Sequence, residues 1–123
     1  MNHREARQMK VTIYHNPRCS KSRATLELLH SKKCEIEIIE YLKDPPTKYT
    51  LKKILKKLGI GPNQLIRRSE PEFREKQLEK TSQADEKLLE SMISSPILIE
   101  RPIVISPKGA AIGRPPENIL KII

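Results

Sequence analysis

A cysteine in a short basic loop is the residue of this sequence with the clearest potential for chemistry. Cys19 stands in the run His-Asn-Pro-Arg-Cys-Ser-Lys-Ser-Arg, residues 15–23, which holds two arginines and one lysine. A thiol attacks as its thiolate, and neighbouring positive charge stabilises that form. The alternative is a small buried residue, the usual fate of a free cysteine. A polar, basic loop favours the reactive thiol over the buried one.

The spacing around Cys19 excludes two familiar kinds of cysteine chemistry. A dithiol-disulfide loop needs a second cysteine three residues on, and Ser22 stands there. The phosphate loop of tyrosine phosphatases needs five residues between cysteine and arginine, whereas three separate Cys19 from Arg23. What remains is a single-thiol nucleophile that acts on an anion and receives its electrons from elsewhere. Cys34, at the start of a predicted strand, is expected to pack rather than to react.

The predicted elements place Cys19 at the start of a helix. Val11, Ile13 and Tyr14 indicate a short strand that Asn16-Pro17 ends, and a helix is expected from about Ser20 to Lys32. The first N–H groups of a helix have no partner within it and carry partial positive charge. They lower the pKa of a thiol placed there and can also hold an oxyanion.

The remaining elements predict an α/β protein with a thioredoxin-like fold. A second strand around Ile36–Ile39 completes a βαβ unit, and residues 48–95 read as mainly helical, with one amphipathic helix closed by Gly59. After Pro96 come a strand at 103–105, a hairpin partner at 110–112 and a last helix behind Pro115-Pro116. The predicted fold is thioredoxin-like, with a mainly helical insertion between the N-terminal βαβ and C-terminal ββα units.

Length and composition predict one cytoplasmic domain. The 123 residues suit a single domain over 10–123, with 1–9 as a flexible lead-in and the insertion at about 48–95. No signal peptide or membrane span is evident, and the scattered His3, His15 and His30 argue against a zinc site. The net charge of +9 comes with only four aromatic residues, so a solvated basic surface is favoured over a nucleic-acid interface. We expect a monomer that binds neither nucleic acid nor membrane.

Several blocks of the chain resemble one family, the glutathione- and glutaredoxin-dependent arsenate reductases. The similarity runs from about Lys10 to Ile123, in matching order. The blocks are Ile13–Arg23, Glu40-Tyr41-Leu42 with Pro45-Pro46, Leu65-Ile66-Arg67-Arg68, Glu100-Arg101-Pro102-Ile103-Val104 and Gly113-Arg114-Pro115-Pro116-Glu117. An ordered series of blocks is far more specific than one cysteine motif.

The resemblance implies a role for each matching residue. Cys19 would be the nucleophile that attacks arsenic(V), and His15 would influence its ionisation. The arginines that bind arsenate and stabilise the later intermediate would be Arg67, Arg101 and Arg114. The substrate-binding loop and the cis-proline beside it would comprise Ser20, Lys21, Ser22, Arg23 and Pro102. Arginine suits this purpose because its planar fork binds oxyanion oxygens in pairs and stays charged.

For each of these residues a structural alternative stays open. Taken singly, an arginine could be a surface residue or could pair with Glu70, Glu100 or Glu117, and His15 could simply be solvated. The sequence alone does not show whether the three arginines converge.

The implied reaction needs no bound cofactor or metal, but it needs glutathione as co-substrate and glutaredoxin as partner. Cys19 would form a covalent arsenic ester, glutathione would attack it on the way to a mixed arsenic(III) thiol species, and glutaredoxin would remove the glutathione before arsenite leaves. One alternative is a similar oxyanion or thiol substrate. Two others are a redox-sensing regulator that binds RNA polymerase, against which Ser22 in place of a cysteine argues, and a glutaredoxin-like thiol-transfer protein.

Overall fold

The chain forms two compact units. The computed structural model describes residues 8–80 and 84–123. One unit, here named the sheet unit, comprises Met1–Glu40 and Arg101–Ile123, and the other, the helical unit, comprises Tyr41–Glu100. The predicted lead-in, residues 1–9, lies mostly outside the described residues. A single domain over 10–123 therefore stays a prediction.

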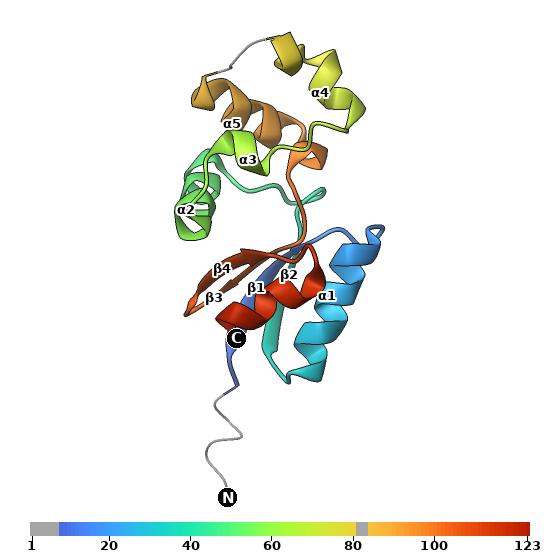
Figure 1. Ribbon diagram of the computed structural model, residues 1–123, viewed down its shortest axis with the longest axis vertical. Helices are drawn as coiled ribbons and strands as arrows, with labels where there is room; N and C mark the ends of the chain where they lie inside the picture. The colour runs from blue at the N-terminus through green and yellow to red at the C-terminus, as the bar shows by residue number, and fades with distance from the viewer. Residues whose placement is uncertain (1–7, 81–83) are drawn as a thin grey trace, which may run out of the picture. The chain divides into compact units, whose positions relative to one another are not determined.

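The sheet unit is built on a four-stranded sheet with the order β2-β1-β3-β4 (Figure 1). Its strands are β1 (Lys10–His15), β2 (Glu35–Glu40), β3 (Ile103–Ser106) and β4 (Gly109–Ile112). β1 pairs with β2 in parallel, while β1 with β3 and β3 with β4 are antiparallel. Helix α1 (Ser20–Ser31) connects the parallel pair. The predicted βαβ unit and the later hairpin are thereby confirmed.

One face of this sheet is covered by α1 and by the 3-10 helix η4 (Pro116–Ile122), as Figure 1 shows. Successive side chains along β1 point to opposite faces of the sheet, so Val11 and Ile13 both point into the core. The buried residues of this core are Val11, Ile13, Leu29, Val104, Ile119 and Ile122, with Met9 and Cys34 partly buried against them. The packing role expected for Cys34 agrees with this position.

The last helix, predicted behind Pro115-Pro116, is η4 and has 3-10 geometry. Its first turn contains an i to i+3 bond, in which the Asn118 N–H donates to the Pro115 carbonyl at 2.9 Å. A segment of seven residues closes few α-helical bonds, so the tighter 3-10 turn competes well there.

The helical unit contains short helices, as the pattern over 48–95 predicted. They are α2 (Lys48–Leu58), α3 (Pro62–Leu65), α4 (Pro71–Glu75), η2 (Leu78–Lys80), α5 (Asp85–Ser94) and η3 (Pro96–Leu98). Thr47 caps α2 by accepting the Thr50 N–H at 3.1 Å, and Gly59 ends it with a left-handed φ of 71°. Lys48 of α2 forms ion pairs with Glu86 and Glu90 of α5. The helix boundary predicted at Gly59 is confirmed.

Candidate functional site

Cys19 is the N-cap residue of α1. Its backbone is extended, with φ −97° and ψ 123°, and the helix begins at Ser20 as the sequence predicts. Asn16 turns the loop that leads into it: the Asn16 carbonyl accepts the Cys19 N–H at 3.0 Å, and Asn16 Oδ1 accepts the Arg18 N–H at 3.0 Å. Sequence reasoning gave Asn16 no role in the site, although asparagine before proline is a recognised turn signal. This turn sets the thiol at the helix N-terminus.

The Cys19 sulfur is surrounded by hydrogen-bond donors. The backbone N–H groups of Ser22 and Lys21 and the guanidinium of Arg101 act on the thiol and lower its pKa. Arg114 Nη1 lies 3.8 Å from Sγ and donates to the Arg101 carbonyl at 3.3 Å. Two arginines far from the cysteine in sequence therefore converge on it in the sheet unit.

These donors shift the ionisation of the thiol. Burial of Cys19 acts to raise its pKa, but the Ser22 and Lys21 N–H groups and the Arg101 guanidinium together outweigh it, so the pKa of Cys19 lies below its ordinary value. The first turn of α1 contains no acidic residue that would oppose them. Burial alone raises the pKa of Cys34. The two thiols of the chain are thus distinguished by their surroundings.

His15 is buried and linked to the loop through Ser22. Its Nδ1 lies 2.8 Å from Ser22 Oγ, which also accepts the Asn16 N–H at 3.0 Å. Burial lowers the pKa of His15, Glu40 acts in the opposite sense, and Arg23 acts in the same sense as burial. A neutral imidazole is therefore favoured at neutral pH. The Ser22 hydroxyl is engaged in these two bonds, and the Ser22 backbone N–H is among the groups that lower the pKa of Cys19.

The other loop residues predicted to bind substrate have different surroundings. Ser20, Lys21 and Arg23 are exposed, and Arg23 Nη1 donates to the Pro17 carbonyl at 2.9 Å. Pro102 is buried and follows a cis peptide bond with Arg101, the geometry that the resemblance implied. The Arg114-Pro115 bond is also cis, which the sequence did not indicate.

Arg67 lies in the helical unit. Its Nε donates to Glu70 Oε2 at 3.2 Å and its Nη1 to Glu100 Oε1 at 2.7 Å. The ion pairs raised as its structural alternative are therefore formed. A role for Arg67 in arsenate binding stays a prediction.

Comparison with known proteins gives the family. Residues 14–122 match the ArsC family. The chain belongs to the ArsC family. It is 45% identical over 115 residues to YfgD of Escherichia coli, covering 93% of this chain and 97% of that protein. It is 42% identical over 115 residues to an arsenate reductase of Rhizobium meliloti, covering 94% of this chain and 82% of that one.

A solved relative agrees with the fold. The arsenate reductase from Vibrio cholerae has 40% sequence identity and a TM-score of 0.90, with 94% of this chain and 99% of that chain covered. The thioredoxin-like fold predicted from the order of elements is thereby confirmed.

The two thiols of this ArsC-family protein should react with iodoacetamide over different pH ranges. Only thiolate reacts at a useful rate. Because the pKa of Cys19 is lowered and that of Cys34 is raised, the rate for Cys19 should rise and level off at lower pH than the rate for Cys34. The measurement follows alkylation by mass spectrometry from pH 5 to 10.

Single-cysteine variants provide the controls for this experiment. Cys34→Ala isolates the profile of Cys19, and Cys19→Ser isolates that of Cys34. Coincident profiles, or a midpoint for Cys19 above that of a free cysteine peptide, would contradict the described surroundings of the sulfur.

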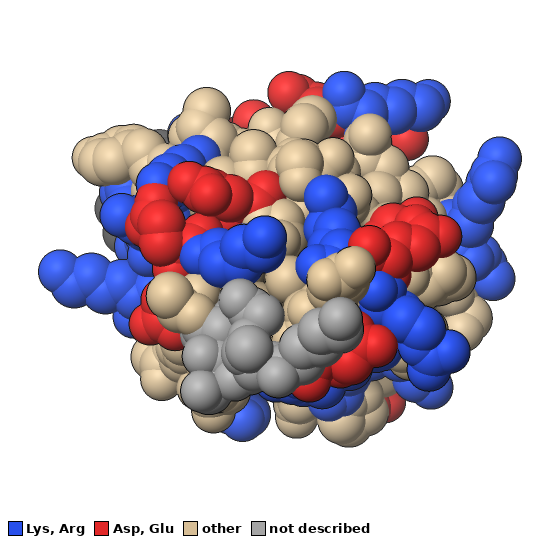
Figure 2. Space-filling model, turned by 90° about the horizontal axis from the view of Figure 1, so that it is seen from above, with Lys and Arg blue, Asp and Glu red and all other residues tan. Residues whose placement is uncertain are grey.

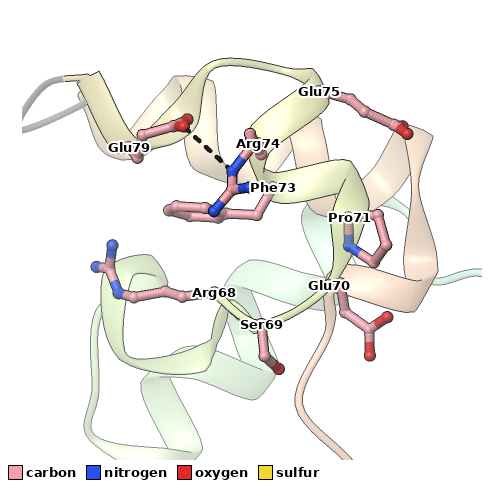
Figure 3. A pocket seen from close by; sticks show the side chains of 8 residues that line it. All are labelled: Arg68, Ser69, Glu70, Pro71, Phe73, Arg74, Glu75 and Glu79. Atoms are coloured by element: carbon pink, nitrogen blue, oxygen red, sulfur yellow. Dashed lines mark ion pairs between the residues drawn. The ribbon is translucent and has the colours of Figure 1, made fainter.

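One cavity of the helical unit is not built for an anion. It measures about 560 Å³ and is shown in Figure 3. Its lining residues are Arg68, Ser69, Glu70, Pro71, Phe73, Arg74, Glu75 and Glu79. The Arg68 guanidinium lies 5.2 Å from the Phe73 ring centroid, and Arg74 pairs with Glu79 at 3.8 Å. None of the residues predicted for the site lines this cavity, and its carboxylates offset its arginines.

On the face seen in Figure 2, the basic side chains do not gather into a patch that could bind an anion. There, Lys and Arg side chains are interspersed with Asp and Glu. Over residues 8–80 and 84–123, no group of three or more His, Cys, Asp or Glu side chains is arranged to hold a metal ion. Within the same part of the chain, no helix is long and apolar enough to cross a membrane.

Proposed function

We propose that this ArsC-family protein reduces arsenate to arsenite, with Cys19 as its single nucleophile and with glutathione and glutaredoxin as the source of electrons. The observation that carries the proposal is the setting of the Cys19 sulfur, at the N-terminus of α1 and within reach of two arginines. The same hydrogen-bond donors stabilise a thiolate and an oxyanion, so this site favours both the Cys19 thiolate and arsenate, the reactants of the first step.

In the first step, the Cys19 thiolate attacks arsenic(V). An As–S bond forms, an As–O bond breaks, and the departing oxygen leaves as water or hydroxide. Arg101 and Arg114 supply guanidinium donors for the arsenate oxygens, and the N–H groups of Ser22 and Lys21 stabilise the sulfur while it is a thiolate. Nucleophilic catalysis in this way divides one difficult reduction into easier displacements.

Electron balance determines where the reduction occurs. Glutathione first replaces a second oxygen on arsenic as water, which leaves arsenic in the +5 state. A glutaredoxin thiolate then attacks the glutathione sulfur and forms a mixed disulfide, and the electron pair of the broken S–As bond stays on arsenic as arsenic(III). Water finally displaces Cys19 and arsenite leaves. Since Ser22 replaces the second cysteine of a dithiol loop, the loop cannot close a disulfide of its own.

The test is arsenate-dependent NADPH oxidation coupled through glutathione reductase. We expect turnover with glutathione and glutaredoxin together, and loss of turnover when either is omitted. Thioredoxin with its reductase serves as the alternative electron source. Absence of arsenate-dependent turnover would reject the proposal, and activity on a glutathionylated peptide in its place would favour the thiol-transfer alternative.

A further inference from the structure

A close contact inside the sheet unit joins α1 to the segment that carries Arg114. Thr25 of α1 is fully buried, and its Oγ1 donates to the Lys21 carbonyl at 2.8 Å and lies 3.4 Å from the Gly113 carbonyl oxygen. The Gly113 N–H donates to the Pro102 carbonyl at 2.9 Å. Gly113 is thus held between α1, whose N-cap is Cys19, and the residue that follows Arg101.

No side chain fits at position 113. A Cβ atom there would lie 2.4 Å from Thr25 Oγ1, 2.9 Å from Pro102 Cγ and 3.1 Å from Thr25 Cγ2. Neither neighbour is the mobile end of a long side chain, because Thr25 is buried and bonded to its own helix and Pro102 is a buried ring. To reach ordinary contact distances the backbone would have to move by about 1 Å.

We propose that Gly113 is a positioning residue for Arg114. The missing side chain lets this segment lie against Thr25 and Pro102, and the next residue then places its guanidinium 3.8 Å from Cys19 Sγ. A displacement of about 1 Å in a positioning group can lower catalysis by about a hundredfold. The inference deepens the proposed function, since Arg114 acts there as an arsenate-binding group.

The effect can be measured at the thiol without arsenate. Iodoacetate is an anion and iodoacetamide is neutral, so the ratio of their alkylation rates at Cys19 reports the positive charge beside the sulfur. The measurement uses a Cys34→Ala background. Arg114→Gln gives the reference ratio without the Arg114 charge, and we expect it to be lower by about fivefold, the value of one unit charge at about 4 Å in water.

For a shift of the Arg114 guanidinium by about 1 Å from its place 3.8 Å from Cys19 Sγ, the same Coulomb relation predicts that Gly113→Ala lowers this ratio by about 1.5-fold. The KM for arsenate should rise by tenfold or more. Gly61→Ala is the matched control, because the nearest atom to its new Cβ, at 3.1 Å, is the exposed end of the Asn63 side chain. It should keep the native ratio and KM. A merely structural role for Gly113 would lower the melting temperature and the active fraction while leaving the ratio and KM native.

A double variant, Thr25→Ala with Gly113→Ala, removes two of the three close contacts and leaves the one to Pro102. Its ratio should lie between that of Gly113→Ala and the native value. If Gly113→Ala fails to fold, the double variant is measured in its place. The ratio of alkylation rates of the double variant must then lie between those of the native protein and Arg114→Gln. A native ratio in folded Gly113→Ala, or in the double variant when it is the replacement, overturns the inference. If the native protein does not reduce arsenate, the proposed function is rejected. The ratio of alkylation rates still tests whether Gly113 positions Arg114.

Discussion

Replacing Cys19 with serine should lower the rate of arsenate-dependent turnover by at least about a thousandfold. The substitution changes one atom, and the N–H groups of Ser22 and Lys21 remain where they are. A hydroxyl at this position stays protonated at neutral pH and forms no labile bond to arsenic that a thiol could later exchange. The measurement is the coupled assay with arsenate, glutathione and glutaredoxin.

Cys34→Ala is the matched control for this experiment. Cys34 is partly buried against the core of the sheet unit, and burial raises its pKa. Its removal should leave the rate of turnover close to that of the native protein. If the substitution has an effect, we expect it to lower the melting temperature only. If turnover survives Cys19→Ser but is lost in folded Cys34→Ala, the assignment of the nucleophile is wrong.

The local elements that place Cys19 could be predicted because they depend on neighbours in sequence. The alternation of Val11 and Ile13 indicates β1, the residue before Pro17 ends it, and the expected start of α1 at Ser20 is confirmed. The same local information gave the end of α2 at Gly59. From these elements alone, the thiol could be placed at a helix N-terminus.

The contacts that complete the site depend on residues far apart and could not be predicted from pattern. The approach of Thr25 to Gly113 spans 88 residues, and that of Arg114 to Cys19 spans 95. A sequence shows that a glycine is present, but only the fold shows which neighbours exclude a Cβ. Side-chain direction within a loop is also hidden from the sequence pattern: Arg23, predicted to bind substrate, instead donates to the nearby Pro17 carbonyl.

Arg101→Lys and Arg114→Lys should each lower kcat/KM for arsenate by about 10² to 10³. Lysine keeps the charge but loses the planar fork that holds two oxyanion oxygens at once. Arg101 is buried, so a misplaced ammonium there has little freedom to find a new partner. The assay is steady-state kinetics with varied arsenate at saturating glutathione and glutaredoxin.

The two variants should differ in their effect on the thiol. Arg101 is among the main causes that lower the pKa of Cys19, through both a hydrogen bond and its charge. Arg101→Lys should therefore raise the pH at which alkylation of Cys19 levels off more than Arg114→Lys does. Because a lowered thiol pKa favours the thiolate above it, the loss of reactivity in Arg101→Lys should be largest near neutral pH and should shrink as the pH rises.

Two arginines of the helical unit separate a specific effect from a general loss of charge. Arg68→Lys is the control, since this exposed guanidinium lies over Phe73 and outside the predicted site, and it should keep native kinetics. Arg67→Lys tests the two roles left open for Arg67. A fall in kcat/KM at an unchanged melting temperature indicates arsenate binding, whereas a fall in melting temperature alone indicates that its pairs with Glu70 and Glu100 are structural. Native kinetics in both Arg101→Lys and Arg114→Lys would contradict an arsenate site built on these two guanidinium groups.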